Sequence, residues 1–259
     1  MSALQQGGHA HKQHVEQQFG GQAAAYLSSQ VHAEGAEFAE LRQAAAEHGA
    51  ARVLDLGCGA GHVGFQVAEP AREVVAYDLS AAMLEVVAAE AARRGLDNLS
   101  TRQGAAERLP FADGDFDLVF SRYSAHHWGD VGLALREARR VLKPGGRLAL
   151  IDVMSPGQPL LDTHLQAVEV LRDSSHVRDY SAGEWLAMLA EAGFAVDSLR
   201  RQRLRLAFDA WTARMRTPPE MAAAIRLLQQ RMGREVRDYF AIEADGSFSA
   251  DVMVSWART

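Results

Sequence analysis

The segment of residues 53–64, VLDLGCGAGHVG, constrains the fold of this 259-residue chain more than any other feature. A short apolar run, typical of a buried strand, ends near the acid Asp55 and opens into a glycine-rich loop. Strand–loop junctions of this kind begin the strand–helix units of α/β proteins, where glycines allow a tight turn. The segment therefore predicts an α/β sheet with a ligand site at the carboxyl end of this strand.

The glycines and the acid of this loop favour different ligands. Gly59, Gly61 and Gly64 spell G-x-G-x-x-G, the dinucleotide fingerprint, in which a pyrophosphate sits at a helix N-terminus. Asp55, however, lies two residues before Gly57, and its charge would repel a pyrophosphate but attract an ammonium group. S-adenosylmethionine carries an ammonium group, a sulfonium and an adenosine end. The loop therefore favours a methyl donor over a hydride carrier.

The composition is that of an ordinary globular protein, with 48% apolar and 23% charged residues, and the length suits a single domain. No apolar run approaches the ~20 residues that span a bilayer, and the polar N-terminus does not resemble a signal peptide. Cys58 is the single cysteine, which fits a reducing compartment. We expect a cytoplasmic protein, and the net charge of −6 argues against a nucleic-acid partner.

Short apolar segments alternate with helical ones from residue 51 onward, which predicts a mostly parallel sheet. Local signals mark the helix ends: Ser80 and Asp130 are placed as N-caps, and Ser181 with Glu184 forms a capping box. The predicted strands are residues 52–56, 74–78, 99–103, 117–121, 147–153, 194–206 and 247–257. The predicted helices of the core and the following half are residues 62–69, 81–94, 131–142, 159–176 and 181–192.

We expect the single domain, residues 1–259, to have three regions. Residues 1–48 would form an N-terminal helical lid, and residues 49–155 a cofactor-binding core. Residues 156–259 would form a C-terminal half with a helical insert at about 208–241. Five residues of the first region are spaced to line one helix face: Val15, Phe19, Tyr26, Leu27 and Val31.

Two further segments can complete a site for an adenosine. Asp78 ends the second predicted strand, where an acid can accept hydrogen bonds from both ribose hydroxyls. Met83 can lay its thioether against an adenine face. Residues 104–111, GAAERLPF, follow the third predicted strand and form a small-residue turn whose backbone can approach a base.

Five ordered blocks together resemble the class I S-adenosylmethionine-dependent methyltransferases, and among them the group that includes the ubiquinone/menaquinone C-methyltransferases. The blocks are residues 53–62, 76–84, 104–111, 116–128 and 141–148. The resemblance implies a Rossmann-like seven-strand methyltransferase sheet, mostly parallel with an antiparallel last strand, and helices on both faces. It also implies S-adenosylmethionine as the cofactor.

The resemblance implies cofactor contacts position by position, from the methionine moiety at Asp55 to the adenine edge at Ala105. The implied cofactor-binding residues are Tyr26, as part of the lid, and Asp55, Gly57, Gly59, Gly61, Asp78, Leu79, Met83, Gly104, Ala105, Ala106, Glu107 and Ser121. Many relatives carry Asp where this chain has Ala105, so another group or water must accept the hydrogen bond of the adenine amine. Glu107 and Gln103 are two candidates.

Polar and aromatic residues follow the fourth predicted strand, at the sheet edge where α/β sites form. Tyr123 and Trp128 are candidate acceptor-binding residues, and His126 or His127 is a candidate general base. Packed neutral histidines are the alternative reading. Asp152 ends the fifth predicted strand and can orient a histidine or cap the next turn.

The helical insert holds three more candidate acceptor-binding residues, Trp211, Arg214 and Arg216. Two guanidiniums and an indole face suit a carboxylate or a phosphate. Ion pairing with Glu220 or near Asp209 is the structural alternative. Residues 200–237 contain ten arginines and three acids, and this local excess of positive charge can also indicate an anionic partner.

The sequence thus predicts methyl transfer to a small cyclic or aromatic metabolite, by in-line displacement at a sulfonium methyl. The alternatives are a tRNA-base methyltransferase that uses the arginines of residues 200–237 and a non-catalytic regulator that binds the cofactor. His9, His11 and His14 lack acids at suitable spacing, so we expect no metal site. The acceptor, the methylated atom and the oligomeric state stay open.

Overall fold

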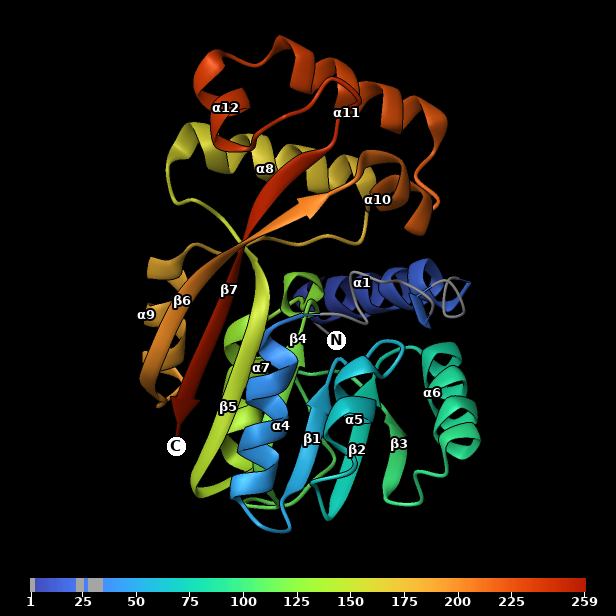
Figure 1. Cartoon of the computed structure of the whole chain (residues 1–259), viewed down its shortest axis with the longest axis vertical. Helices are drawn as coiled ribbons and strands as arrows, with labels where there is room; N and C mark the ends of the chain where they lie inside the picture. Colours follow the sequence, from blue (N-terminus) through green and yellow to red (C-terminus); the bar gives the residue numbers. More distant parts are fainter. Residues whose placement is uncertain (1–2, 22–25, 28–34) are drawn as a thin grey trace.

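One mixed sheet organises the computed structural model, which describes residues 3–21, 26–27 and 35–259, with side chains from residue 10 onward. The strands are β1 (Arg52–Leu56), β2 (Glu73–Asp78), β3 (Leu99–Gln103), β4 (Phe116–Arg122), β5 (Leu142–Met154), β6 (Ala195–Leu206) and β7 (Phe248–Arg258). They lie in the order β3-β2-β1-β4-β5-β7-β6 (Figure 1). β7 is antiparallel to β5 and β6, and the remaining pairs are parallel. The predicted seven-strand sheet with an antiparallel last strand is confirmed.

The winding of the sheet reverses at β1, which pairs with β2 on one side and with β4 on the other. The connections that leave the two neighbouring strands therefore diverge and leave a crevice at their carboxyl ends. Open α/β sheets bind their ligands at such a switch point. The glycine loop begins directly after β1, so the topology carries it into this crevice.

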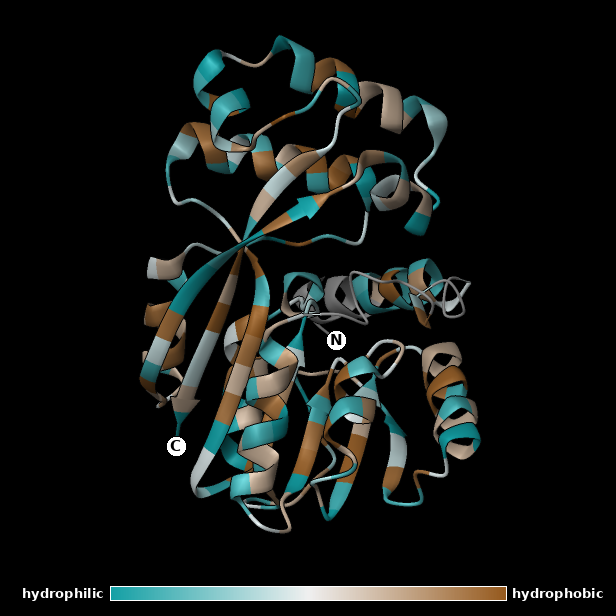
Figure 2. Cartoon of the chain, in the orientation of Figure 1, coloured by the Kyte–Doolittle hydropathy of each residue, from teal (hydrophilic) through white to brown (hydrophobic). Residues whose placement is uncertain are grey.

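Helices cover both faces of the sheet, as predicted. The apolar faces of α4 (Glu37–Glu47) and α5 (His62–Val67) share one buried cluster with strand residues such as Val53. On the opposite face α7 (Val131–Val141) and α9 (Ala182–Glu191) pack in a second cluster around residues such as Leu54. Figure 2 shows apolar residues concentrated along the central strands. Adjacent residues of β1 thus serve opposite faces, as strand geometry requires.

The predicted caps are confirmed, and they begin helices where the sequence indicated. The Ser80 hydroxyl accepts from the backbone N–H of Met83 at the start of α6 (Ala81–Arg94). The Asp130 carboxylate accepts from the N–H of Leu133 at 2.8 Å, at the start of α7. α9 begins with the Ser181–Glu184 capping box.

Two helix ends and one strand differ from the predictions by two residues or more. α8 (Pro159–Arg172) ends four residues before the predicted position 176, because Asp173 adopts an extended backbone and its carboxylate accepts from the Ser175 N–H. α5 ends at Val67 rather than 69. β5 begins at Leu142, where it already pairs with Phe116, and not at residue 147.

A second helical layer lies beyond the carboxyl edge of the sheet (Figure 1). It consists of α8, α10 (Phe208–Arg214), α11 (Pro219–Arg231) and α12 (Arg234–Tyr239). These helices and the first residues of β7 enclose an apolar cluster that includes Trp211, Phe240 and Phe248. The predicted insert is therefore helical. α1 (Ala3–Gly20) lies between this layer and the sheet edge. None of the helices in the described part of the chain has the length and apolar character that a membrane crossing requires.

Candidate active site

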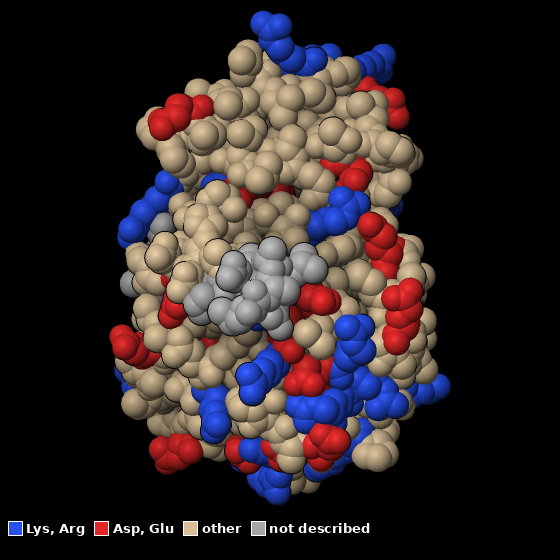
Figure 3. Space-filling view, turned by 180° about the vertical axis from the view of Figure 1, so that it is seen from behind, with Lys and Arg blue, Asp and Glu red and all other residues tan. Residues whose placement is uncertain are grey.

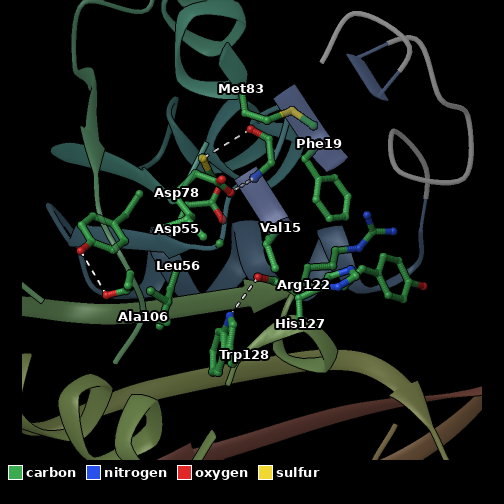
Figure 4. Close-up of a pocket in the computed structure, with 18 of the residues that line it drawn as sticks. Val15, Phe19, Asp55, Leu56, Asp78, Met83, Ala106, Arg122, His127 and Trp128 are labelled. Atoms are coloured by element: carbon green, nitrogen blue, oxygen red, sulfur yellow. Dashed lines mark hydrogen bonds between the residues drawn. The ribbon is translucent and has the colours of Figure 1, made fainter. Parts of the chain in front are cut away.

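A cavity of about 1010 Å³, open solvent at its mouth included, lies at the carboxyl ends of β1, β2 and β4 (Figure 4). We call it the first cavity. The residues predicted for the site that line it are Tyr26, Asp55, Gly57, Gly59, Asp78, Leu79, Met83, Gly104, Ala105, Ala106, Glu107, Tyr123, His127 and Trp128. The switch point of the sheet therefore brings most of these residues together around one cavity.

The glycine loop is held at its start by the neighbouring strand. The backbone N–H groups of Gly57 and Cys58 both donate to the Tyr77 carbonyl, at 2.8 and 3.0 Å. Gly57 has a φ of +70°, and a Cβ at this position would collide with the Ser124 hydroxyl. Ser124 in turn accepts a hydrogen bond from Trp128 Nε1 at 3.1 Å. Only glycine lets the loop approach the segment after β4 this closely.

Asp55 is almost fully buried at the end of β1 and faces the first cavity. Its Oδ2 accepts from the Gly64 N–H at 2.8 Å, which ties the strand end to the first turn of α5. Burial, with the nearby charge of Asp78 adding to it, raises the pKa of Asp55 to about 7, although the hydrogen bond from Gly64 lowers it. A buried acid with a raised pKa favours a cationic partner, because a neighbouring positive charge stabilises its ionised form.

Asp78 holds the middle of the loop through both oxygens of its carboxylate. Oδ2 accepts from the Gly59 N–H and Oδ1 from the Ser80 N–H, each at 2.8 Å. Burial raises the pKa of Asp78, while these backbone contacts lower it. The carboxylate also lines the first cavity, so each oxygen can use a second lone pair toward a ribose hydroxyl.

Small residues form the turn after β3, which lines the first cavity together with Met83. The Tyr77 hydroxyl donates to the carbonyl groups of Ala105 and Arg108, both at 3.2 Å, and a Cβ on Gly104 would collide with this hydroxyl. Leu79, Ala105 and Ala106 therefore present a low apolar wall beside Met83, which suits a flat base.

Both residues considered as adenine acceptors in place of an Asp at position 105, Glu107 and Gln103, already make other polar contacts. Glu107 lines the first cavity, but its carboxylate accepts from the Gly129 N–H at 3.1 Å and pairs with Lys12 of α1 at 3.1 Å. Gln103 lies outside the lining of the first cavity and donates to the Leu79 carbonyl at 2.9 Å. Glu107 thus anchors α1 across the mouth of the cavity.

α1 closes the first cavity through polar contacts and one aromatic ring. His11 Nε2 donates to the His127 carbonyl at 3.0 Å, and His14 contacts the Ser174 hydroxyl at 2.8 Å. The Phe19 ring lies edge-on against the ring of His127, with centroids 4.9 Å apart. His11 and His14 thus serve to dock the helix. The side chain of His9 and the whole of Val31 lie outside the described residues.

Tyr26 joins the N-terminal region to the insert. Its hydroxyl donates to Met215 Sδ at 2.8 Å, and its carbonyl accepts from His62 Nε2 at 3.0 Å. The ring stacks edge-on with Phe19, with centroids 5.6 Å apart. Tyr26 is therefore buried between the first cavity and the helical layer, at the place where a lid residue was expected.

Four predicted site residues, Gly61, Ser121, Asp152 and Arg216, line neither cavity of the described structure. Gly61, with a φ of +84°, begins α5 and faces Val87 instead. The Ser121 hydroxyl is buried within the sheet, because successive strand residues point to opposite faces and Arg122 faces the cavity. Arg216 turns back at a positive φ, and its guanidinium binds the Gly21 carbonyl.

A second cavity of about 550 Å³, open solvent included, adjoins the first below the helical layer. Phe19, Tyr26, Tyr123 and His127 line both cavities. The other residues that line the second cavity are His126, Val153, Glu169, Arg172, Asp179, Leu204, Leu206, Trp211 and Arg214. Tyr123 stands at this boundary with a φ of +53°, a strained value for a non-glycine residue and one that recurs at functional sites.

His126 and Asp152 form a close buried pair at the second cavity. The distance from His126 Nδ1 to Asp152 Oδ1 is 2.6 Å, and the Asp152 carboxylate also accepts from the His126 N–H. Burial alone would lower the pKa of His126, but the charge and hydrogen bond of Asp152 raise it to about 9. His126 is thus an imidazolium at neutral pH, and Asp152 orients it rather than capping the next turn.

His127 has the opposite protonation state. Burial and the positive charge of His126 lower the pKa of His127 to about 3, so its imidazole is neutral. Its Nδ1 lies 3.2 Å from the Ser175 carbonyl, which can only accept, so the proton resides on Nδ1. Nε2 then carries the lone pair and lies 3.8 Å from Asp173 Oδ2.

Sequence reasoning misses the polar residues that α8 and the following loop contribute to the second cavity, Glu169, Arg172 and Asp179. Glu169 and Arg172 are three residues apart and form an ion pair, a spacing that on most helices marks an exposed pair. Nothing local distinguishes them from surface residues. Their burial follows from packing against α10, since the Arg172 guanidinium lies 5.0 Å from the Trp211 ring.

Six of the ten arginines between residues 200 and 237, four of them in β6, form ion pairs with acids of the same chain. Arg201 and Arg203 pair with the buried Asp251, and Arg205 pairs with Glu243. Further pairs join Arg200 to Glu40, Arg226 to Asp209 and Arg234 to Asp238. On the face shown in Figure 3, Lys and Arg are interspersed with Asp and Glu. The local excess of arginine therefore does not build a basic surface there.

Comparison with known proteins identifies the family. A profile described as "Methyltransferase domain" matches residues 54–150. The uncharacterized protein YafE of Escherichia coli K12 is 57% identical over 198 residues, which cover 76% of this chain and 96% of YafE. The uncharacterized methyltransferase YcgJ of Bacillus subtilis 168 is 37% identical over 230 residues, or 88% of this chain and 90% of YcgJ. The crystal structure of YcgJ matches with a TM-score of 0.82 and 34% identity, and covers 86% of this chain and 97% of that one.

The chain is an S-adenosylmethionine-dependent methyltransferase. The first cavity fits the methyl donor of this family by its chemistry. Asp55 would offer a carboxylate to the ammonium group, Asp78 would offer acceptors to the ribose, and the apolar wall beside Met83 would suit the adenine. Arg122 also lines the cavity, and its guanidinium is held there by a buried ion pair with Glu37 at 2.8 Å.

The raised pKa of Asp55 predicts pH-dependent cofactor binding by the methyltransferase. Below its pKa of about 7 the free carboxyl is protonated, whereas an ammonium ligand needs the carboxylate. The affinity for S-adenosylhomocysteine should fall by about tenfold between pH ~7.5 and pH ~5.5. Titration calorimetry at both pH values measures this. Asp55→Asn should bind more weakly at the higher pH and show a much flatter profile; equal affinities for the unmodified protein at both pH values would contradict the role of Asp55.

Asp78→Ala should weaken S-adenosylhomocysteine binding by more than about tenfold. The substitution removes both the acceptors for the ribose and the contacts that fix Gly59 and Ser80. Asp113→Ala, at an exposed carboxylate, is the matched control. Calorimetry with thermal denaturation of each variant separates lost binding from lost folding. An unchanged affinity would remove Asp78 from the cofactor site.

The His126–Asp152 pair predicts a stability profile with a definite sign. The pKa of His126 is about 9 in the folded state and ~6.5 in the unfolded chain. The resulting stabilisation of the fold is fully present below pH ~6.5 and is lost as the pH rises through ~9. His126→Gln should therefore lower the free energy of unfolding more at pH ~6 than at pH ~9.5, by about 3 kcal/mol. Urea unfolding measures the difference, with the exposed His48→Gln as control. A loss of equal size at both pH values would refute the pairing.

Proposed function

We propose that this methyltransferase acts on a small cyclic or aromatic acceptor that binds in the second cavity. The observation that carries the proposal is the shared boundary: Phe19, Tyr26, Tyr123 and His127 line both cavities. S-adenosylmethionine, when bound, supplies an electrophilic methyl group on a sulfonium. Methyl transfer requires chiefly that the nucleophile be positioned against this group, and adjoining cavities provide that proximity.

The shape and lining of the second cavity favour a ring-containing acceptor. Leu204, Leu206 and Val153 form an aliphatic wall, and Trp211 with Phe19 adds two aromatic rings. Flat apolar surfaces of this kind suit an aromatic or alicyclic body. The volume, about 550 Å³ with open solvent included, is that of a small-molecule site.

His127 is the better of the two candidate bases. A base must be unprotonated before it takes a proton, and His127 is neutral at rest. Its lowered pKa of about 3 makes it a weak base that needs stabilisation of the charge it gains. The proton would enter at Nε2, and the Asp173 carboxylate, 3.8 Å away, would stabilise the resulting charge. His126 is already charged at neutral pH and acts as a hydrogen-bond donor oriented by Asp152.

The alternative of tRNA-base methylation receives little support. The arginines that motivated it are largely engaged with acids of the same chain, and the second cavity lies beneath α1 and the helical layer. A polynucleotide backbone needs an exposed basic surface. Pocket size and arginine pairing both favour the small acceptor.

Radiolabelled methyl transfer tests the proposal. The protein should bind S-adenosylmethionine and S-adenosylhomocysteine but not NADH, and label from S-adenosylmethionine should enter the small-molecule fraction of a cell extract. His127→Asn should lower this transfer by about a hundredfold, the contribution of a general base, with cofactor affinity retained.

His48→Asn, at an exposed residue, is the control for this assay. Label that appears in tRNA instead would support the alternative activity. Cofactor binding without transfer to any fraction would favour the non-catalytic regulator and overturn the proposed function.

A further inference from the structure

We infer that the acceptor is a carboxylic acid and that Arg172 and Arg214 hold its carboxylate at one end of the second cavity. This inference rests on the proposed function, since it names the class of molecule that the second cavity receives. The two arginines come from different helices, α8 and α10, and both line the cavity. The carboxylate anchors the acceptor, and the methyl group goes to another atom of the same molecule.

The first observation is that both guanidiniums lie beside one neutral oxygen. Arg172 and Arg214 line the second cavity together with Tyr26, and the charges of both act on the Tyr26 hydroxyl. Because burial raises the pKa of Tyr26, the hydroxyl stays uncharged, and it donates its own proton to Met215 Sδ. Two cations beside one neutral oxygen are arranged as they would be around an anion.

The second observation is that Arg172 is fixed in place before any ligand binds. Its Nε donates to the Trp211 carbonyl at 3.1 Å, and Nη1 contacts Glu169 Oε2 at 3.4 Å. The guanidinium also stacks over the Trp211 ring at 5.0 Å. A guanidinium held in a fixed orientation loses little entropy when it binds a planar carboxylate.

The charges around the two arginines favour a single negative charge. Burial lowers the pKa of Arg214, and the nearby charge of Arg172 lowers it further, so an anion between them would relieve this repulsion. Burial raises the pKa of Asp179 far above its usual range, with the charge of Glu169 adding to it, which favours the neutral form of Asp179. Glu169 remains beside Arg172 and would repel a dianionic phosphate more than a carboxylate.

The arginines also explain why the carboxylate would not itself be methylated. Guanidinium hydrogen bonds occupy the oxygen lone pairs that attack on a methyl group requires. The reacting atom is therefore another atom of the acceptor, directed to the part of the boundary formed by Tyr123 and His127, since Tyr26, which also lines both cavities, lies beside the arginines. An acceptor with a ring between its carboxylate and its nucleophile fits this layout.

Paired ligands test the inference on the full-length protein saturated with S-adenosylhomocysteine. Calorimetry is run with a series of aromatic and alicyclic carboxylates, from benzoate to naphthoate, and with the corresponding neutral amides. At least one carboxylate should bind about tenfold more tightly than its amide. Arg214→Gln and Arg172→Gln should each remove this preference with S-adenosylhomocysteine affinity retained. Arg216→Gln, two residues from Arg214 but outside the cavity, is the matched control.

Each outcome has one meaning. Equal binding of carboxylates and amides, or no binding of any carboxylate, would overturn the inference while the proposed function stands on its transfer assay. A preference that survives both arginine substitutions would also overturn it. If one variant fails to fold, as thermal denaturation reveals, the other decides the result. Loss of S-adenosylhomocysteine binding in the unmodified protein would instead defeat the proposed function.

Discussion

Two buried carboxylates hold the glycine loop, and the site is built on them. Asp55 fixes the start of α5 through the Gly64 N–H. Asp78 fixes the loop between β1 and α5 through the Gly59 N–H. Both carboxylates also face the first cavity, where burial makes their negative charge costly. A ligand that brings a cation offsets this cost. The contacts that shape the loop thus also set its preference for a positively charged ligand.

The layers above the sheet convert this cofactor site into a two-part active site. α1 is tied down by the contact of Lys12 with Glu107 and of His11 with the backbone of His127. Its Phe19 ring then forms part of the boundary between the cavities, together with Tyr26 and Tyr123. The helical layer closes the second cavity from the other side. Donor and acceptor sites therefore adjoin because three regions of the chain meet at one sheet edge.

Local sequence signals predicted most of the fold, and most of the residues they proposed for the cofactor line the first cavity. The caps at Ser80 and Asp130 work through contacts within three residues, and Asp55 and Asp78 stand at strand ends that the parallel sheet brings together. Sequence spacing alone did not predict which side chains face the cavity, because this depends on the direction in which each side chain points. The Ser121 side chain is buried away from the cavity, whereas its neighbour Arg122 lines the cavity. No periodicity can assign such a face without the register of the neighbouring strands.

The sequence by itself determined the α/β alternation, the glycine loop and the kind of cofactor that an acid beside that loop attracts. These features depend on residues close together in the chain, where local geometry fixes their relation. Only the tertiary structure brought Tyr26, Arg172 and Arg214 together and separated the charged His126 from the neutral His127. Those relations join residues far apart in sequence. Packing of the helical layer on the sheet edge sets their distances and burial, and hence their protonation.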